Sequence, residues 1–172
     1  MQKFQRIIGI PGLSNLGIVK ETEEVDGLGG YTKQPRIYRG AKPENPKGYF
    51  SARSALGVNT CVNLETYNNE VNVAAQAGIQ VIHFPLTVFS KVSVGEIDQI
   101  IETLMDKINQ PVLVHCLQGH DRTGMIIACF RMAVDHWSLA DALEEMDAYG
   151  YQHLWMEMAA NVEHYAQAKG FK

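Results

Sequence analysis

The sequence has few cysteines, no long apolar run and no internal repeat, and each absence excludes a class of protein. Three cysteines in 172 residues are too few for a disulfide scaffold and fit a reducing compartment, so we expect a cytoplasmic protein. No stretch of about 18 consecutive apolar residues predicts a membrane span, and the N-terminal apolar stretch is too short and broken for a secretory leader. No period of about 20–50 residues indicates a solenoid.

What the chain does contain is enough apolar material for one core. Hydrophobic residues make up 46% of the sequence and charged residues 20%. This composition and length predict a single domain over residues 1–172.

Charge is unevenly distributed along the chain. Residues 1–53 contain nine Lys and Arg against five Asp and Glu, whereas residues 54–172 contain six against fourteen, for a net charge of -4. A negative body argues against non-specific nucleic-acid binding, which depends on many cationic contacts with phosphates. The six cations of residues 31–53 either favour a small, highly anionic ligand or only solvate a loop-rich surface.

Hydrophobic periodicity predicts alternating strands and helices. Residues 1–35 are rich in Gly, Pro and charged side chains and are predicted to be an irregular N-terminal segment. Strands are predicted at 37–39, 58–64, 79–84 and 111–114, and helices at 46–56, 70–77, 93–108, 123–137, 138–149 and 152–168. This order predicts an α/β fold with a mainly parallel central sheet flanked by helices.

The strongest chemical signal is the segment 115–124, which reads HCLQGHDRTG. It lies between an apolar strand and an apolar helix, so its loop is expected at the carboxyl end of a buried strand, where open α/β sheets bind ligands. Cys116 begins the loop and Arg122 closes it, with five residues between them. A loop this short turns successive amides towards one point, at the positive end of the following helix, and so predicts an anion-binding nest.

The residue types in this nest predict nucleophilic attack on a phosphoryl group. Arg122 can bind two phosphoryl oxygens at once, and the amides and helix dipole favour the thiolate of Cys116. Gly119 permits the turn of the loop. The residues predicted to bind phosphate are Leu117, Gln118, Gly119, His120, Asp121 and Arg122.

Two other interpretations of the segment are weaker. Cys116 could be a small buried hydrophobe and Arg122 a helix-start cation, but the surrounding glycines and Thr123 would then be unexplained. A zinc ion held by His115, Cys116 and His120 would lie beside the uncompensated charge of Arg122. We therefore expect neither a metal nor another cofactor.

Segment 115–124 resembles the signature of the cysteine-based protein tyrosine phosphatase superfamily, which is His-Cys, five residues, then Arg and Ser or Thr. The matching positions are His115, Cys116, Gly119, Arg122, Thr123 and Gly124. Residues 37–43, 57–64 and 78–86 look like the corresponding elements of compact atypical dual-specificity phosphatases. The resemblance covers about residues 36–137 as the catalytic core, leaves residues 138–172 as C-terminal helices, and implies a phosphatase domain that works without a metal.

The resemblance also implies a two-step reaction and a role for each residue. Cys116 takes the phosphoryl group, and water then hydrolyses the phosphocysteine. Thr123 would hydrogen-bond the Cys116 sulfur and help it leave, and His115 would fix the loop and the thiolate from behind.

The sequence departs from the familiar phosphatases in lacking their general acid. Those enzymes carry an aspartate on the loop that precedes the long helix, but residues 71–95 contain no Asp or Glu. Asp121 could donate the proton instead, because the loop ends in Asp-Arg-Thr and is in this respect similar to the loops of myotubularin-like and Sac-type phosphoinositide phosphatases. Alternatively, Asp121 could form a structural salt bridge or cap the helix. Alternatively the substrate is a phosphoanhydride, whose leaving group departs without an acid, as for the RNA-triphosphatase members.

The expected substrate follows from the charges near the loop. His120 and Lys91 would join the cations of residues 31–53 if they face the loop, although Lys91 could be a solvated surface residue and Arg39 a structural cation paired with a carboxylate. We therefore expect a cysteine phosphatase acting on a small anionic phosphorylated substrate, an inositol polyphosphate or phosphoinositide. The alternatives are a dual-specificity protein phosphatase, a sulfurtransferase or arsenate-reductase-like enzyme, and a catalytically weak phosphate-binding module.

Overall fold

One sheet organises the chain in the computed structural model, which describes residues 4–25 and 31–172. The described strands are β1 (Gln5–Arg6), β2 (Gly17–Val25), β3 (Tyr31–Ala41), β4 (Thr60–Asn63), β5 (Gln80–His83) and β6 (Val112–Cys116), in the order β1-β2-β3-β6-β4-β5. Strands β3, β6, β4 and β5 are parallel, and β2 and β1 add antiparallel pairs at the edge of β3. The predicted mainly parallel α/β sheet is confirmed.

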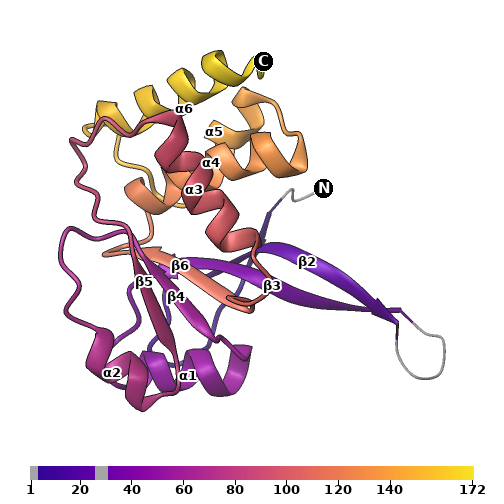
Figure 1. Cartoon of the computed structure of the whole chain (residues 1–172), viewed down its shortest axis with the longest axis vertical. Coiled ribbons are helices and arrows are strands. Elements are labelled where there is room, and N and C mark those ends of the chain that lie inside the picture. The colour runs from indigo at the N-terminus through magenta and orange to yellow at the C-terminus, as the bar shows by residue number, and fades with distance from the viewer. Residues whose placement is uncertain (1–3, 26–30) are drawn as a thin grey trace.

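Helices cover both faces of this sheet (Figure 1). Helices α1 (Lys47–Leu56) and α2 (Val71–Gln76) lie on one face, and α3 (Val94–Met105), α4 (Asp121–Asp135), α5 (Leu139–Ala148) and α6 (Met156–Lys169) lie on the other. A separate hydrophobic cluster fills each side. Because both faces are covered, every residue of β4 and β6 is buried, whereas β4 was expected to alternate between buried and exposed positions.

Most helix boundaries follow the capping residues seen in the sequence. Helix α1 follows Pro46 and ends at Gly57, whose φ is 69°. Ser93 forms a capping box at the start of α3, and the Ser138 hydroxyl caps α5. Helix α3 ends at Met105, three residues earlier than predicted, because the side chains of Asn109 and Gln110 bind its last carbonyls and leave Ile108 exposed.

The prediction of an irregular segment over residues 1–35 is wrong for much of its length. Strands β2 and β3 form a long hairpin that projects from the body of the molecule (Figure 1). Residues 20–23 of β2 are all polar, and Arg36 Nε donates to Thr22 Oγ1 at 3.1 Å, so this stretch lacks the apolar alternation that marks a half-buried strand. The glycine cluster of residues 27–30 lies outside the described residues.

Two smaller boundaries also differ from prediction. Helix α4 begins at Asp121, two residues earlier than expected, and α6 begins at Met156, four residues later. Residues 149–155 instead form a connection that contacts the 115–124 segment. None of the described helices combines the length and the apolar character that a bilayer crossing requires.

Candidate active site

The predicted strand–loop–helix arrangement of residues 115–124 is confirmed. Cys116 is the last residue of β6, Asp121 is the first of α4, and residues 117–120 join them. Gly119 adopts a φ of 71°, and a Cβ there would lie 2.5 Å from the backbone of Gly40. Only glycine permits both this conformation and this contact, so the loop packs directly on β3.

Carbonyl oxygens of this loop are held from outside. The backbone amide of Lys42 donates to Cys116 O at 2.8 Å, and that of Leu64 donates to His115 O at 2.9 Å. Asn15 Nδ2 reaches Gln118 O at 3.2 Å. Because the C=O and N–H of a trans peptide point in opposite directions, the contacts at Cys116 O and Gln118 O favour inward amides at Leu117 and Gly119, where an anion would bind them.

Arg122 is oriented by the segment 84–93, which replaces the usual acid-bearing loop. Its Nη1 donates to Leu86 O at 3.1 Å. Its Nε is buried and has no hydrogen-bond partner in the described part of the chain. The guanidinium is therefore fixed on one side and keeps donors for a phosphoryl group.

Behind Cys116, His115 belongs to a buried polar network that the sequence did not reveal. His115 Nε2 lies 3.0 Å from Glu70 Oε1, and Tyr49 donates its hydroxyl to Glu70 Oε2 at 2.7 Å. Burial alone would raise the pKa of Glu70, but His115, Tyr49 and the Lys42 ammonium hold it below its usual value. A carboxylate accepts hydrogen bonds, so Glu70 places a proton on His115 Nε2 and fixes the ring.

The same network contains the ligand types of a metal site. Glu65, Glu70 and His115 offer ligand atoms that lie within 4.8 Å of one another. Lys42 Nζ, however, lies 2.7 Å from Glu65 Oε2 and 3.8 Å from Glu70 Oε2. The lysine already compensates both carboxylates, so this cluster is explained as a network of ion pairs.

Asp121 and Thr123 are both buried at the start of α4. Asp121 is buried, and its Oδ1 accepts the backbone amide of Gln152 at 2.8 Å, which fastens the connection 149–155 to the loop. Thr123 Oγ1 is buried and has no hydrogen-bond partner among the described residues, so the expected bond to the Cys116 sulfur is not formed here.

The lysines expected to face the loop, Lys42 and Lys91, have other surroundings. Lys42 is paired with Glu65, and Arg39 is fully buried with Glu145 at 3.8 Å, as in the alternative of a cation paired with a carboxylate. Lys91 lines a separate hollow of about 550 Å³ between residues 91–93 and α6, which includes no residue of the loop. The ring of His120 lies against the backbone of Gly150.

Residues 31–168 match the model described as the tyrosine phosphatase family. The chain belongs to this family.

Two relatives of this tyrosine phosphatase family member are named for different activities. The dual specificity protein phosphatase TpbA of Pseudomonas aeruginosa is 31% identical over 122 residues, which is 70% of this chain and 54% of TpbA. The inositol diphosphatase DSP4 of Arabidopsis thaliana is 32% identical over 121 residues, which is 66% of this chain and 59% of DSP4. The chain thus spans little more than half the length of these relatives.

Solved structures confirm the tyrosine phosphatase fold. The crystal structure of P. aeruginosa TpbA has a TM-score of 0.73 and 25% identity, covering 95% of this chain and 91% of TpbA. The core catalytic domain of the PP-IP phosphatase SIW14 of Saccharomyces cerevisiae has a TM-score of 0.66 at 23% identity, covering 78% of this chain and 88% of that domain.

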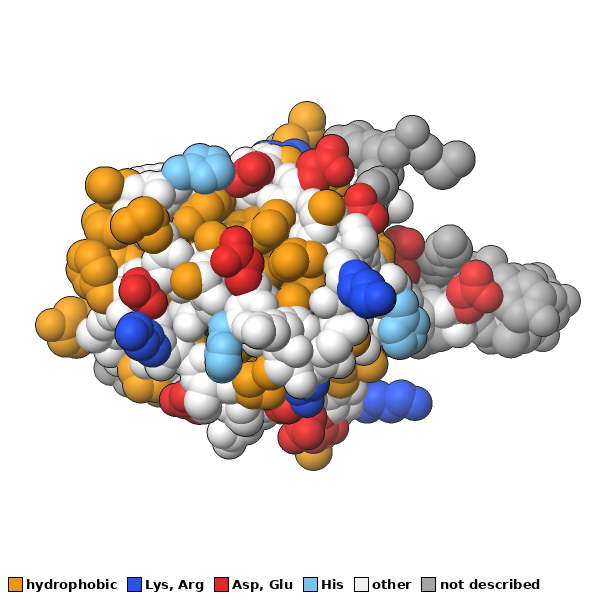
Figure 2. Space-filling view, turned by 90° about the horizontal axis from the view of Figure 1, so that it is seen from above, with side chains coloured by type: hydrophobic (Ala, Val, Ile, Leu, Met, Phe, Trp, Pro, Cys, Tyr) orange, Lys and Arg blue, Asp and Glu red, His pale blue; other side chains and the backbone are white. Residues whose placement is uncertain are grey.

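In this tyrosine phosphatase family member, the segments around the loop expose several apolar side chains. Leu117 in the loop, Phe89 in segment 84–93 and Leu154 in connection 149–155 are all exposed, and the Phe89 ring meets that of Trp155 edge-on at 5.4 Å. Met156, the first residue of α6, is also exposed. Figure 2 looks onto the helical layer and shows hydrophobic side chains gathered on its left, with charges of both signs between them.

Proposed function

We propose that the chain is a cysteine phosphatase that works through a phosphocysteine. The observation that carries the proposal is the loop itself: Cys116 and Arg122 stand at its two ends, its carbonyls are bound from outside, and Arg122 Nε is a buried donor without a partner in the described part of the chain. We further propose that residues 1–172 act as one phosphatase domain. The three buried free cysteines support a reducing compartment such as the cytoplasm.

The reaction needs no group beyond those of the loop and one water molecule. The Cys116 thiolate attacks phosphorus, a P–S bond forms, the bond to the leaving oxygen breaks, and that oxygen departs as an anion or takes a proton. Water then attacks the phosphorus of the phosphocysteine and loses a proton. The new P–O bond forms as the P–S bond breaks, which releases phosphate and the Cys116 thiolate. The inward amides and Arg122 stabilise the charge that develops on the phosphoryl oxygens in both steps.

Inositol polyphosphates that carry a diphosphate are the substrate class we propose first. Segment 84–93 presents the paired hydroxyls of Thr87 and Ser90 where the family places its acid, and no carboxylate lies there. A phosphoanhydride needs no acid, because its leaving group is already a stable phosphate anion. Relatives named as inositol diphosphatases support this choice.

A second candidate is supported by the surroundings of the loop. The exposed Leu117, Phe89 and Leu154 suit a phosphorylated aromatic side chain better than a cluster of phosphates. The relative TpbA, named as a dual specificity protein phosphatase, is consistent with it. Asp121 would then be the candidate proton donor, because a serine or threonine alkoxide needs one.

A substrate panel separates the two candidates. The panel contains an inositol polyphosphate with a diphosphate, the same inositol without it, a phosphotyrosine peptide, a phosphoserine peptide and p-nitrophenyl phosphate. We expect kcat/KM to be highest for the diphosphate, with the monoester inositol at least tenfold slower. Preference for the phosphopeptides would favour the second candidate, and no turnover of any compound would leave only a phosphate-binding module.

A further inference from the structure

Arg39 is a buried cation that contacts the loop from β3. Its side chain is 0% exposed, and its Nη2 donates to Gly119 O at 3.1 Å. Its guanidinium carbon lies 3.7 Å from the centre of the Tyr149 ring. Two further donors, Nε and Nη1, are buried without a hydrogen-bond partner in the described residues.

The single contact with Gly119 has a geometric consequence for the loop. Gly119 O belongs to the peptide group that ends in the amide of His120. Holding this oxygen against Arg39 therefore points the His120 N–H the other way, towards the inside of the loop. The Cys116, His115 and Gln118 carbonyls have other donors, so Arg39 supplies the anchor for this peptide alone.

Arg39 is also incompletely neutralised. The carboxylate nearest to it, Glu145, makes shorter contacts with Arg131, at 2.7 and 3.0 Å, than with Arg39 Nη1, at 3.8 Å. Burial lowers the pKa of Arg39 to about 10, while Glu145, Tyr149 and Cys116 act to raise it. The residue is therefore charged at neutral pH, and its charge lies against the loop that begins at Cys116.

Tyr149 keeps the guanidinium in place. The Arg6 guanidinium lies over the same ring at 4.4 Å, and the Tyr149 hydroxyl donates to Gln5 O at 3.2 Å. Gly17 makes room for the ring, since a Cβ at that position would overlap the Tyr149 hydroxyl. β1, β2 and the end of α5 thus combine to hold the side chain of Arg39 under the loop.

We propose that Arg39 is a positioning residue for catalysis, which turns the His120 amide into the loop and keeps a positive charge beneath the loop. This rests on the proposed phosphatase function of the loop. It differs from a purely structural role because it predicts weaker binding of phosphate analogues and a less acidic Cys116 thiol when Arg39 is changed.

Two variants of Arg39 separate its hydrogen bond from its charge. Arg39→Lys keeps the charge but cannot both lie flat on Tyr149 and reach Gly119, so orthovanadate should bind about tenfold more weakly. Arg39→Met also removes the charge and should raise the pH midpoint of Cys116 alkylation by iodoacetamide by about one unit. Cys61 and Cys129 do not interfere, because burial raises the pKa of both thiols.

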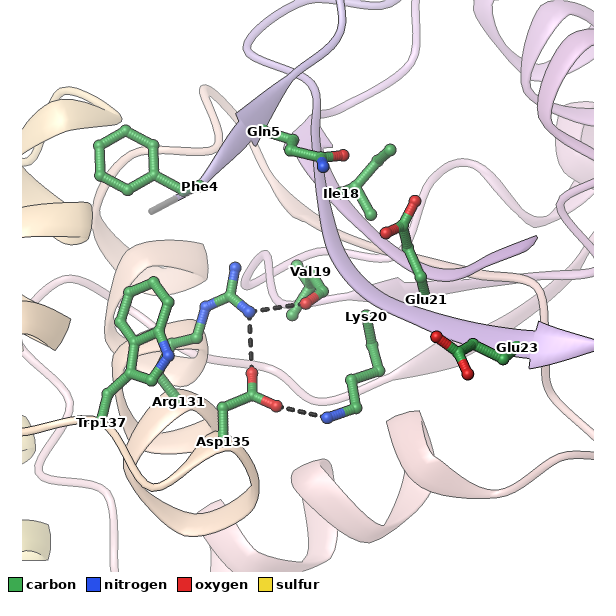
Figure 3. A pocket seen from close by; sticks show the side chains of 10 residues that line it. All are labelled: Phe4, Gln5, Ile18, Val19, Lys20, Glu21, Glu23, Arg131, Asp135 and Trp137. Atoms are coloured by element: carbon green, nitrogen blue, oxygen red, sulfur yellow. Dashed lines mark hydrogen bonds and ion pairs between the residues drawn. The ribbon is translucent and has the colours of Figure 1, made fainter. Parts of the chain in front are cut away.

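Arg131→Lys is the matched control, since Arg131 is a second buried arginine on the same carboxylate. Figure 3 shows Arg131 bonded to the Val19 carbonyl and to Asp135, whose other oxygen meets Lys20, and none of these contacts reaches the loop. The control should lower the melting temperature. It should change vanadate affinity by less than about twofold and the pH midpoint of Cys116 alkylation by less than about 0.2 unit.

A further variant keeps the test decisive if the Arg39 variants do not fold. Tyr149→Leu removes the ring that holds the guanidinium without touching the loop, and it should weaken vanadate binding in the same direction. The proposal is overturned if folded Arg39 or Tyr149 variants bind vanadate like wild type, or if Arg131→Lys weakens binding equally. Failure of the proposed function would be a separate result, namely that the wild-type protein hydrolyses no phosphorylated substrate. Vanadate binding and Cys116 alkylation would still measure the effect of changing Arg39 in that case.

Discussion

At the scale of single residues, the chemistry depends on a cysteine with almost no exposed surface. Cys116 is only 2% exposed, at the end of a buried strand, so a substrate reaches its sulfur only through the loop that follows. In the proposed mechanism, the loop amides and Arg122 bind the phosphoryl group independently of the sulfur. Binding and covalent chemistry can therefore be separated by substitution.

Cys116→Ser should abolish turnover of p-nitrophenyl phosphate while phosphate or vanadate binding stays measurable, because the amides and Arg122 remain. Calorimetry and a steady-state assay on the same sample measure both quantities. Arg122→Lys should lose both, since an ammonium cannot replace the planar fork across two oxygens. Substantial turnover by Cys116→Ser would exclude covalent catalysis by this residue.

Asp121→Asn tests whether the carboxylate within the loop donates a proton. An asparagine oxygen can still accept the Gln152 amide, so the variant preserves the contact seen in the structure. If Asp121 is the acid, hydrolysis of an inositol phosphate monoester should fall by about 10²–10⁴-fold, whereas p-nitrophenyl phosphate, with its good leaving group, should be spared. Equal loss on both would assign Asp121 to shaping the loop, and no loss would favour the anhydride substrate.

At the scale of elements, helix α6 holds the acid-free segment 84–93 against the loop. Asn161 Oδ1 accepts the amide of Val92 at 3.0 Å, and its Nδ2 donates to Ser90 O at 2.8 Å. The same segment binds Arg122 through Leu86 O. A side chain of α6 therefore stabilises the wall that orients the arginine.

Asn161→Leu should lower the free energy of unfolding by about 1–3 kcal/mol, because it leaves a buried backbone amide without a partner. It should also raise KM for p-nitrophenyl phosphate and speed hydrogen exchange in residues 86–92. Asn109→Leu is the control, since Asn109 closes α3 away from the site. That variant should lose stability without changing KM; equal kinetic effects in both would contradict the role given to Asn161.

Glu70 links the start of α2 to the residue before Cys116 and makes stability depend on pH. Its pKa is lower in the folded chain than the usual 4.5, so the ionised carboxylate stabilises the fold above that pH, and this contribution is lost as the pH falls through the folded value. Urea unfolding from pH 7 downwards should show a steeper loss for wild type than for Glu70→Gln. The exposed Glu102→Gln should follow wild type, and parallel curves for Glu70→Gln and wild type would refute the linkage.

At the scale of the whole molecule, the uneven charge of the sequence does not become a cationic site. Lys42 is paired with Glu65, Arg39 is fully buried beneath the loop with Glu145 at 3.8 Å, and Lys91 lies in a different hollow. Lys91→Gln should therefore change KM for inositol hexakisphosphate and for p-nitrophenyl phosphate by less than about twofold, at low and at physiological salt. A rise in KM for the hexakisphosphate alone, which disappears at higher salt, would show that Lys91 does contribute to a cationic substrate site.

The sequence by itself determined the fold class and the centre of the site. Alternating strand and helix periodicities are local signals, and they led to the parallel sheet and to most helix boundaries. The strand–loop–helix arrangement of segment 115–124 could also be predicted, because a tight loop between a strand and a helix is determined by adjacent residues. Polar strands carry no such signal, and the β2–β3 hairpin was missed for that reason.

Only the tertiary structure decided which distant groups meet at this centre. Arg39 lies 80 residues from Gly119, Glu70 lies 45 from His115, and Asn161 lies 71 from Ser90, yet each pair is in contact. It also decided that Lys42 is paired with Glu65, whereas Arg39 is buried against the loop. The physical reason is that charge pairing and burial depend on packing between elements, whereas a sequence pattern reports only the preferences of neighbouring residues.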